Sequence, residues 1–263
     1  RPGWHIECST RNRKAFGDQI DIHGGGRDLI FPHHENEIAQ TEALTGKPFA
    51  KYWIHNGLIK VNGQKMSKSL GNSLFLKDLL DNYSQETIKF ALLQTNYRGD
   101  INVTDNLFPD AEKHLVEFYK LFKLAMDKGV KILGEVKEID DEFNACMDND
   151  FNTALALSNL FVYFKKVKAK LNNNDESAGA MLNQIKNTYS LLGLFTTDVE
   201  EFLNKYSKEE AVSIPEEILA LAEKMQGARA VKDYATADTL RTEIADKGYI
   251  VKISKDGYSV EKK

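Results

Sequence analysis

The sequence predicts an α/β unit, then a long helical region, then a small mixed α/β unit. Three observations indicate this order. Short strand-like segments and a helical pattern alternate up to about residue 75, which is the rhythm of an α/β fold. From about residue 76 the apolar residues recur at helical spacing. The last fifty residues hold two amphipathic helical patterns followed by a hairpin pattern, so we expect a separate small unit there.

Composition narrows the class of protein. With 263 residues, of which 42% are hydrophobic, the chain can bury a core and hold two or three units. The sequence contains neither an apolar stretch long enough to span a membrane nor a signal peptide, so we expect a soluble, cytoplasmic protein with no membrane partner. Two cysteines cannot form a disulfide framework. Because the net charge is −4, any nucleic acid would have to bind to a local basic patch.

The first 72 residues give several short elements, each with its own local signal. They are a strand end at 4–8, a strand at 18–23, a helix from Pro32 to about Thr45, a strand at 52–61, a tight turn at Asn62-Gly63 and a loop at 65–72. The loop contains two lysines and two serines, which offer many hydrogen-bond donors to a polyanion.

The remaining elements are mostly helical. Helices are expected at about 76–80, 86–95, 109–124, 151–171, 177–194, 218–231 and 233–247, and a hairpin is expected at 249–260. The acidic segment between about 198 and 215 is interpreted as a linker. The chain begins without methionine in a segment that is expected to be structured, so we expect it to be part of a longer protein.

The stretch from His23 to Glu37 is unusually rich in groups that bind metals or carry protons. Three consecutive glycines follow His23, and glycine allows a ligand to approach the backbone closely. Pro32 suits the first turn of a helix, which places His33 and Glu37 at i and i+4 on one face. This is the spacing of metal ligands, although a surface helix that begins with histidines would have the same local pattern.

Three motifs together resemble one enzyme family. The segment Lys65-Met66-Ser67-Lys68-Ser69 is similar to the second signature of class I aminoacyl-tRNA synthetases. The segments Trp4-His5-Ile6-Glu7-Cys8-Ser9 and His23 to Glu37 narrow the resemblance to cysteinyl-tRNA synthetases. The resemblance covers the whole chain, strongly up to Asn72 and more diffusely after it. It implies part of a Rossmann-type catalytic domain that joins L-cysteine to tRNA(Cys) through cysteinyl-adenylate, with ATP as the energy source.

The resemblance also implies a zinc site. Its ligands here are Cys8, His33 and Glu37, and the family's fourth ligand is a cysteine that precedes the matched segment. A thiolate and an imidazole suit Zn²⁺, which binds a soft sulfur far better than a hydroxyl. Trp4 and His23 fall at family positions that line the cysteine pocket. Zinc recognition of the substrate sulfur would separate cysteine from serine without an editing site.

The ATP site is implied by five further positions. By resemblance, Gly25, Gly26 and Asp28 lie against the adenosine ribose of ATP, which enters with Mg²⁺. Lys65 and Lys68 are the catalytic lysines, which stabilise charge on the phosphates as pyrophosphate leaves. The family's first ATP signature, His-x-Gly-His, is not found in this sequence. We therefore expect this chain to be inactive alone.

The predicted organisation has three parts. Residues 1–108 hold the C-terminal half of the catalytic domain with the zinc site and lysine loop, residues 109–212 a helical tRNA-binding bundle, and residues 213–263 a small anticodon-recognition domain. The enzyme is expected to be a monomer. Two alternatives remain: a cysteine:amino-sugar ligase on the same scaffold, and a non-catalytic module that binds tRNA or zinc. The long helical region favours an RNA-binding enzyme over the amino-sugar ligase.

Overall fold

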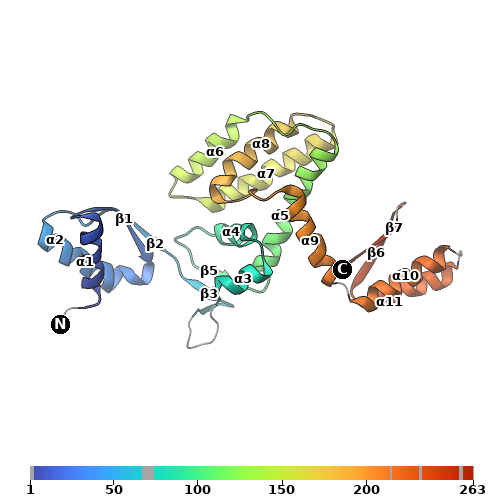
Figure 1. Cartoon of the computed structure of the whole chain (residues 1–263), viewed down its shortest axis with the longest axis horizontal. Coiled ribbons are helices and arrows are strands. Elements are labelled where there is room, and N and C mark those ends of the chain that lie inside the picture. Colours follow the sequence, from blue (N-terminus) through green and yellow to red (C-terminus); the bar gives the residue numbers. More distant parts are fainter. Residues whose placement is uncertain (1–2, 67–73, 214, 231–232, 255–256, 263) are drawn as a thin grey trace. The chain divides into compact units, whose positions relative to one another are not determined.

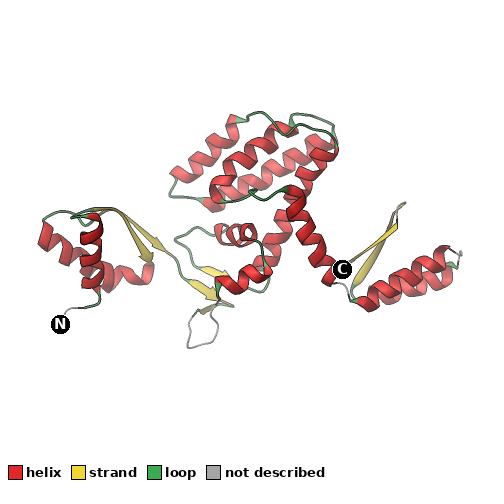
Figure 2. Cartoon of the chain, viewed as in Figure 1, coloured by secondary structure: helices red, strands yellow, loops and turns green. Residues whose placement is uncertain are grey.

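The computed structural model describes residues 3–66, 74–213, 215–230, 233–254 and 257–262 (Figure 1). The chain forms two compact units, Arg1–Asp198 and Val199–Lys263, which we describe one at a time. Helices make up most of both units and the strands are short (Figure 2). Within the described ranges, no helix has the length and apolar character needed to cross a membrane.

The first element is the helix α1, His5–Phe16, where the sequence predicts a strand end. That prediction is wrong. An alternation over five residues does not outweigh a stretch of 12 residues that contains neither glycine nor proline. Glu7 and Arg11 form an i to i+4 ion pair at 2.8 Å on the exposed side of the helix. The helix ends at Gly17, whose φ of 91° suits glycine. Cys8 therefore lies on a helix.

Two parallel strands follow and frame a second helix. They are β1, Ile20–Gly26, and β2, Ala50–Asn56, separated by a 3-10 turn at Arg27–Leu29, a π-helical turn at Ile30–His34 and α2 at Glu35–Thr45. The predicted strand at 18–23 is confirmed and extends through the three glycines. The regular helix predicted from Pro32 begins only at Glu35. Phe31 has an extended backbone, as the residue before a proline usually does.

A second small sheet places β3, Ile59–Val61, between β4, Gln64–Lys65, and β5, Ile101–Val103. The tight turn at Asn62-Gly63 is confirmed, since both residues have positive φ. The single strand predicted at 52–61 is wrong because the chain leaves the first sheet at Gly57. There the backbone passes so close to another segment that a Cβ on Gly57 would come within 1.9 Å of the Gly99 carbonyl oxygen.

Helices make up the rest of the first unit. They are α3 (Leu76–Asn82), α4 (Gln85–Leu93), α5 (Leu107–Asp127), α6 (Lys137–Asp148), α7 (Thr153–Asn172), α8 (Ala178–Tyr189) and a 3-10 turn at Ser190–Leu192. The core between α5 and α7 is aromatic: Phe118 stacks on Phe164 with ring centroids 4.1 Å apart. Apolar residues at helical spacing therefore bury one face of each long helix, as the sequence predicts.

The second unit consists of α9 (Val199–Ser213), α10 (Glu216–Ala230), α11 (Tyr234–Asp246), β6 (Tyr249–Ser254) and β7 (Gly257–Lys262). The interpretation of the acidic segment as a linker is wrong, because most of it is the helix α9. That segment is rich in helix-forming residues and has no glycine or proline before Pro215. The predicted helix pair and antiparallel hairpin are confirmed.

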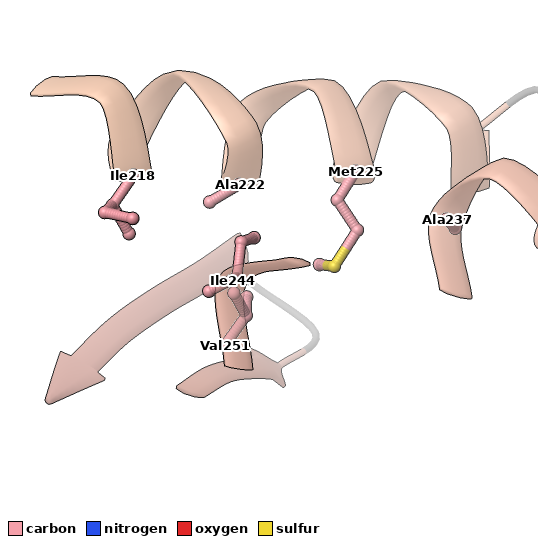
Figure 3. Packing of buried hydrophobic residues seen from close by; sticks show 6 residues of the cluster. All are labelled: Ile218, Ala222, Met225, Ala237, Ile244 and Val251. Carbon is pink, nitrogen blue, oxygen red and sulfur yellow. The ribbon is translucent and has the colours of Figure 1, made fainter. Parts of the chain in front are cut away.

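A small apolar core holds this second unit together. Figure 3 shows six buried side chains from α10, α11 and β6, namely Ile218, Ala222, Met225, Ala237, Ile244 and Val251. Tyr249 packs against this cluster and is partly buried. Its ring therefore contributes to the core of the unit.

Candidate functional site

The structure brings together the three residues for which the sequence predicts zinc binding. Cys8 comes from the first half of α1, His33 from the π-helical turn, and Glu37 from the first turn of α2. Their ligand atoms all lie within 4.8 Å of one another. His33 and Glu37 are buried, and Cys8 is partly exposed. A thiol, an imidazole and a carboxylate are thus close enough together to bind the same metal ion.

The Glu37 carboxylate fits a bound cation. It is fully buried, and neither of its oxygens has a hydrogen-bond partner among the described residues. His33 Nε2 and His23 Nε2 approach the two oxygens to 3.1 and 2.7 Å, but neither approach has hydrogen-bond geometry. A buried carboxylate whose oxygens accept no hydrogen bond is costly. A cation beside it would remove that cost, and the sulfur and nitrogen donors match zinc.

Cys8 faces the same carboxylate. Burial raises the pKa of the Cys8 thiol, and the neighbouring Glu37 raises it further. A metal ion beside the sulfur acts in the opposite direction, because a coordinating thiol is deprotonated outright. Metal binding at this site would therefore release a proton from Cys8.

A second group of potential ligands shares Glu37. His23, His34 and Glu37 also place one ligand atom each within 4.8 Å of the others. His34 Nδ1 lies 2.9 Å from His55 Nε2, so the two imidazoles share a hydrogen bond. Burial, followed by His23, lowers the pKa of His34, and burial, followed by Arg98, lowers the pKa of His55. Both rings therefore favour the neutral form, which can accept a proton or bind a metal.

Trp4 and His5 support His33 from its other side. The Trp4 ring stacks on His33 with centroids 3.6 Å apart and an interplanar angle of 14°. His5 Nδ1 lies 2.9 Å from His33 Nδ1. His33 Nε2 is therefore left to face Glu37, in the way that a hydrogen bond to one imidazole nitrogen orients a metal-binding ring. Trp4 itself is 59% exposed, so its ring forms part of an open surface beside the site.

His5, His34 and His55 are further residues of the site that the sequence did not predict. Five of the six histidines fall in the first 55 residues, and this clustering is the feature of the sequence that could have indicated them. Histidines that lie far apart along the chain meet only because α1, the π-helical turn and β2 converge. Cys146, the other cysteine, lies buried in α6, where its sulfur accepts a hydrogen bond from Asn159 Nδ2 at 3.8 Å.

Of the residues predicted to bind ATP, Gly25 and Gly26 end β1 and Asp28 lies in the 3-10 turn after it; we call residues 24–29 the glycine-rich turn. A Cβ on Gly25 would come within 3.1 Å of the His34 ring, and one on Gly26 within 2.4 Å of Asp28 Oδ1. Lys65 Nζ lies 4.0 Å from Asp28 Oδ2, so the lysine at the end of β4 reaches the glycine-rich turn. Lys68 lies outside the described residues.

Comparison with known proteins identifies the family. Residues 1–113 match the family model of the class I (C) tRNA synthetase catalytic domain, and residues 142–196 match that of the DALR domain. A cysteine-tRNA ligase from Caldicellulosiruptor saccharolyticus is 40% identical over 100% of this chain. One from Bacillus cytotoxicus is 42% identical over 98% of the chain. The chain belongs to the cysteine-tRNA ligase family. It spans about half the length of these two relatives, 57% and 56% respectively.

The fold agrees with this membership in the class I synthetases. A LeuRS from Agrobacterium radiobacter, solved in a ternary complex with tRNA and LeuAMS, superposes with a TM-score of 0.58. The superposition covers 70% of this chain and 27% of that one at 17% identity, so it concerns the fold alone. The expected fold class, an α/β catalytic portion followed by helices, is therefore confirmed.

Proposed function

We propose that this chain is the part of a cysteine-tRNA ligase that selects cysteine through zinc and supplies the lysine loop for adenylate formation. The whole enzyme would join L-cysteine to tRNA(Cys) at the expense of ATP. The observation that carries the proposal is the buried Glu37 carboxylate, which has no hydrogen-bond partner among the described residues and lies within ligand distance of Cys8 and His33. The chain alone would be inactive, because the family's first ATP signature is not found in its sequence.

In this proposal Cys8, His33 and Glu37 hold Zn²⁺. Bound zinc supplies a soft electrophilic centre that binds the sulfur of cysteine and gives serine no comparable partner. His5 and Trp4 keep the His33 ring in place through the contacts described above. His23 contacts the Glu37 carboxylate and the rings of Phe49 and Trp53, and it would line the cysteine pocket.

The nucleotide would lie beside this pocket. Gly25 and Gly26 leave room beside the backbone for the His34 ring and the Asp28 carboxylate. Asp28 would accept hydrogen bonds from the ribose hydroxyls of ATP. Lys65 and Lys68 would meet the charge that develops on the phosphates, with Mg²⁺ entering as part of the ATP complex. Support comes from the 4.0 Å approach of Lys65 to Asp28, which joins the two segments at one place.

The helices after residue 109 would contact tRNA, and residues 213–263 would contact its anticodon loop. The relatives that match this chain along its whole length, helical part included, are cysteine-tRNA ligases. That match favours tRNA over an amino sugar as the acceptor. We retain 1–108, 109–212 and 213–263 as the proposed functional divisions, a monomer as the proposed state and the cytoplasm as the proposed location.

Metal analysis and ATP–pyrophosphate exchange test this proposal in a complete synthetase that carries the chain. We expect zinc in the wild type and cysteine-dependent exchange. Cys8→Ser should weaken zinc binding by more than the roughly 10- to 100-fold that outer-shell changes cost, because it removes a ligand. Cys146→Ser is the matched control and should keep the metal. A wild type without zinc, or a Cys8→Ser variant with full zinc content, would show that the site is misassigned.

A further inference from the structure

Outside the proposed metal and nucleotide residues, one carboxylate joins three segments of the first unit. Asp100 stands just before β5. Its oxygens lie 2.7 and 2.8 Å from Arg27 Nη2, and Lys60 Nζ lies 2.9 Å from Oδ2. The Leu58 N–H donates to Oδ1 at 2.9 Å. The Leu58 N–H, followed by Lys60, holds the pKa of Asp100 at about 2, so the group is ionised at physiological pH.

Two of the joined segments lead directly to the proposed nucleotide residues. Arg27 lies in the glycine-rich turn, next to Asp28. Lys60 lies in β3, whose hairpin partner β4 ends at Lys65. The side chains of Asp28 and Lys65 are 52% and 66% exposed, so packing does little to fix the distance between them. That distance depends on how the glycine-rich turn is held against the β3–β4 hairpin.

We propose that Asp100 is a positioning residue for the nucleotide site, holding the glycine-rich turn against the hairpin that leads into the lysine loop. This inference rests on the proposed function. Charge-assisted hydrogen bonds from an arginine and a lysine are stronger than neutral ones, and the backbone donor fixes the carboxylate itself. Replacing Asp100 by asparagine keeps an acceptor for Leu58 but removes the charge that holds Arg27 and Lys60.

Asp150 provides a matched control within the same unit. It accepts hydrogen bonds from Arg98 Nε at 2.5 Å and from Tyr97 at 2.7 Å, and its pKa is also lowered to about 2. Like Asp100, it is an ionised carboxylate paired with an arginine distant in sequence. It joins the segment just before α7 to residues 97–98. Neither of these segments contains a residue that is proposed to bind ATP.

The first measurement is hydrogen–deuterium exchange on this chain. Asp100→Asn should speed exchange in residues 24–29 and 59–66, because the tie between those segments is lost. Asp150→Asn should leave both segments as they are in the wild type. If Asp100→Asn leaves both segments unchanged, the inference is wrong.

The second measurement is steady-state ATP–pyrophosphate exchange in a complete synthetase. Asp100→Asn should raise the KM for ATP about tenfold, within the roughly 10²-fold that a displacement of 1 Å can cost. The KM for cysteine and the zinc content should stay unchanged. Arg27→Ala should give the same loss, and the double variant no more than either single one, because the two residues act as a pair.

The outcomes separate this inference from the function on which it rests. An equal rise in both KM values, or equal effects of Asp100→Asn and Asp150→Asn, would overturn the role of Asp100. A wild type without cysteine-dependent exchange would overturn the proposed function instead. Hydrogen exchange alone would then decide whether Asp100 ties the two segments together.

Discussion

Glu86 is expected to stabilise the first unit through its buried carboxylate. This glutamate of α4 is 2% exposed. Its carboxylate accepts hydrogen bonds from residues 195–197, which follow the helical bundle. Oε1 accepts hydrogen bonds from the backbone and hydroxyl groups of Thr196 and Thr197, at 2.8 to 2.9 Å. Oε2 accepts from the Phe195 N–H and the Tyr119 hydroxyl, both at 2.9 Å.

The change Glu86→Gln preserves the shape and removes one acceptor. Oriented with its oxygen toward Thr196 and Thr197, the amide keeps those four bonds in weaker, neutral form. The Tyr119 hydroxyl can turn to the Thr197 carbonyl, 3.3 Å away, and accept from the new amide. The Phe195 N–H then faces another donor and is left unsatisfied. One such buried group lowers the free energy of unfolding by about 1–3 kcal/mol, and the weaker neutral hydrogen bonds lower it further. We therefore expect a total loss of roughly 2–4 kcal/mol.

Urea unfolding, followed by circular dichroism and by tyrosine fluorescence, measures this loss. Glu117→Gln is the control: it breaks an exposed pair with Lys120 and should change the free energy of unfolding by less than about 0.5 kcal/mol. The two probes also show whether the unit unfolds in one step, which the comparison requires. A Glu86→Gln variant as stable as the control would refute the reasoning from buried hydrogen bonds.

Three further predictions concern activity and pH. In a complete synthetase, Lys68→Ala should slow adenylate formation roughly 10²- to 10³-fold with little change in cysteine affinity, and an unchanged exchange rate would contradict its role. Deleting residues 214–263, which leaves α9 whole, should preserve cysteine activation and weaken aminoacylation of tRNA; undiminished charging would make that segment structural only. Arg98, followed by Tyr97, depresses the pKa of Asp150 to about 2, below the unfolded value of about 3.9, so its contribution is full above about pH 4 and is lost as the pH falls. The unfolding free energies of wild type and Asp150→Asn should therefore converge between about pH 4 and pH 2, and a constant difference would argue against this pair.

Local patterns in the sequence predicted the local parts of the site. The i to i+4 spacing of His33 and Glu37 and the turn at Asn62-Gly63 depend on neighbouring residues, and the structure contains both. The helix that carries Cys8 was not predicted because the five-residue alternation at 4–8 was considered without the eight residues of α1 that follow it. In such short segments an alternating pattern favours a strand, whereas a long stretch without glycine or proline favours a helix. Here the long stretch formed a helix.

The nonlocal parts of the site were not predictable in the same way. The contact between His34 and His55 spans 21 positions, and that between His5 and His33 spans 28. The ties of Asp100 to Arg27 and Lys60 likewise join segments whose own sequences give no sign of a partner. Such contacts are set by how helices and strands pack, and a single sequence carries little information on that packing.

Glu37 is shared by two groups of ligands, and the distances distinguish them. Two donors bound to one tetrahedral zinc at about 2.0–2.2 Å lie roughly 3.3 Å apart. His33 Nε2 and Glu37 Oε1, at 3.1 Å, come close to this separation without any ion, whereas His23 Nε2 and Glu37 Oε2, at 2.7 Å, are too close to flank one. The distances therefore favour a metal on the side of Cys8 and His33. His23 Nε2 would then remain an ion-pair contact of the far carboxylate oxygen.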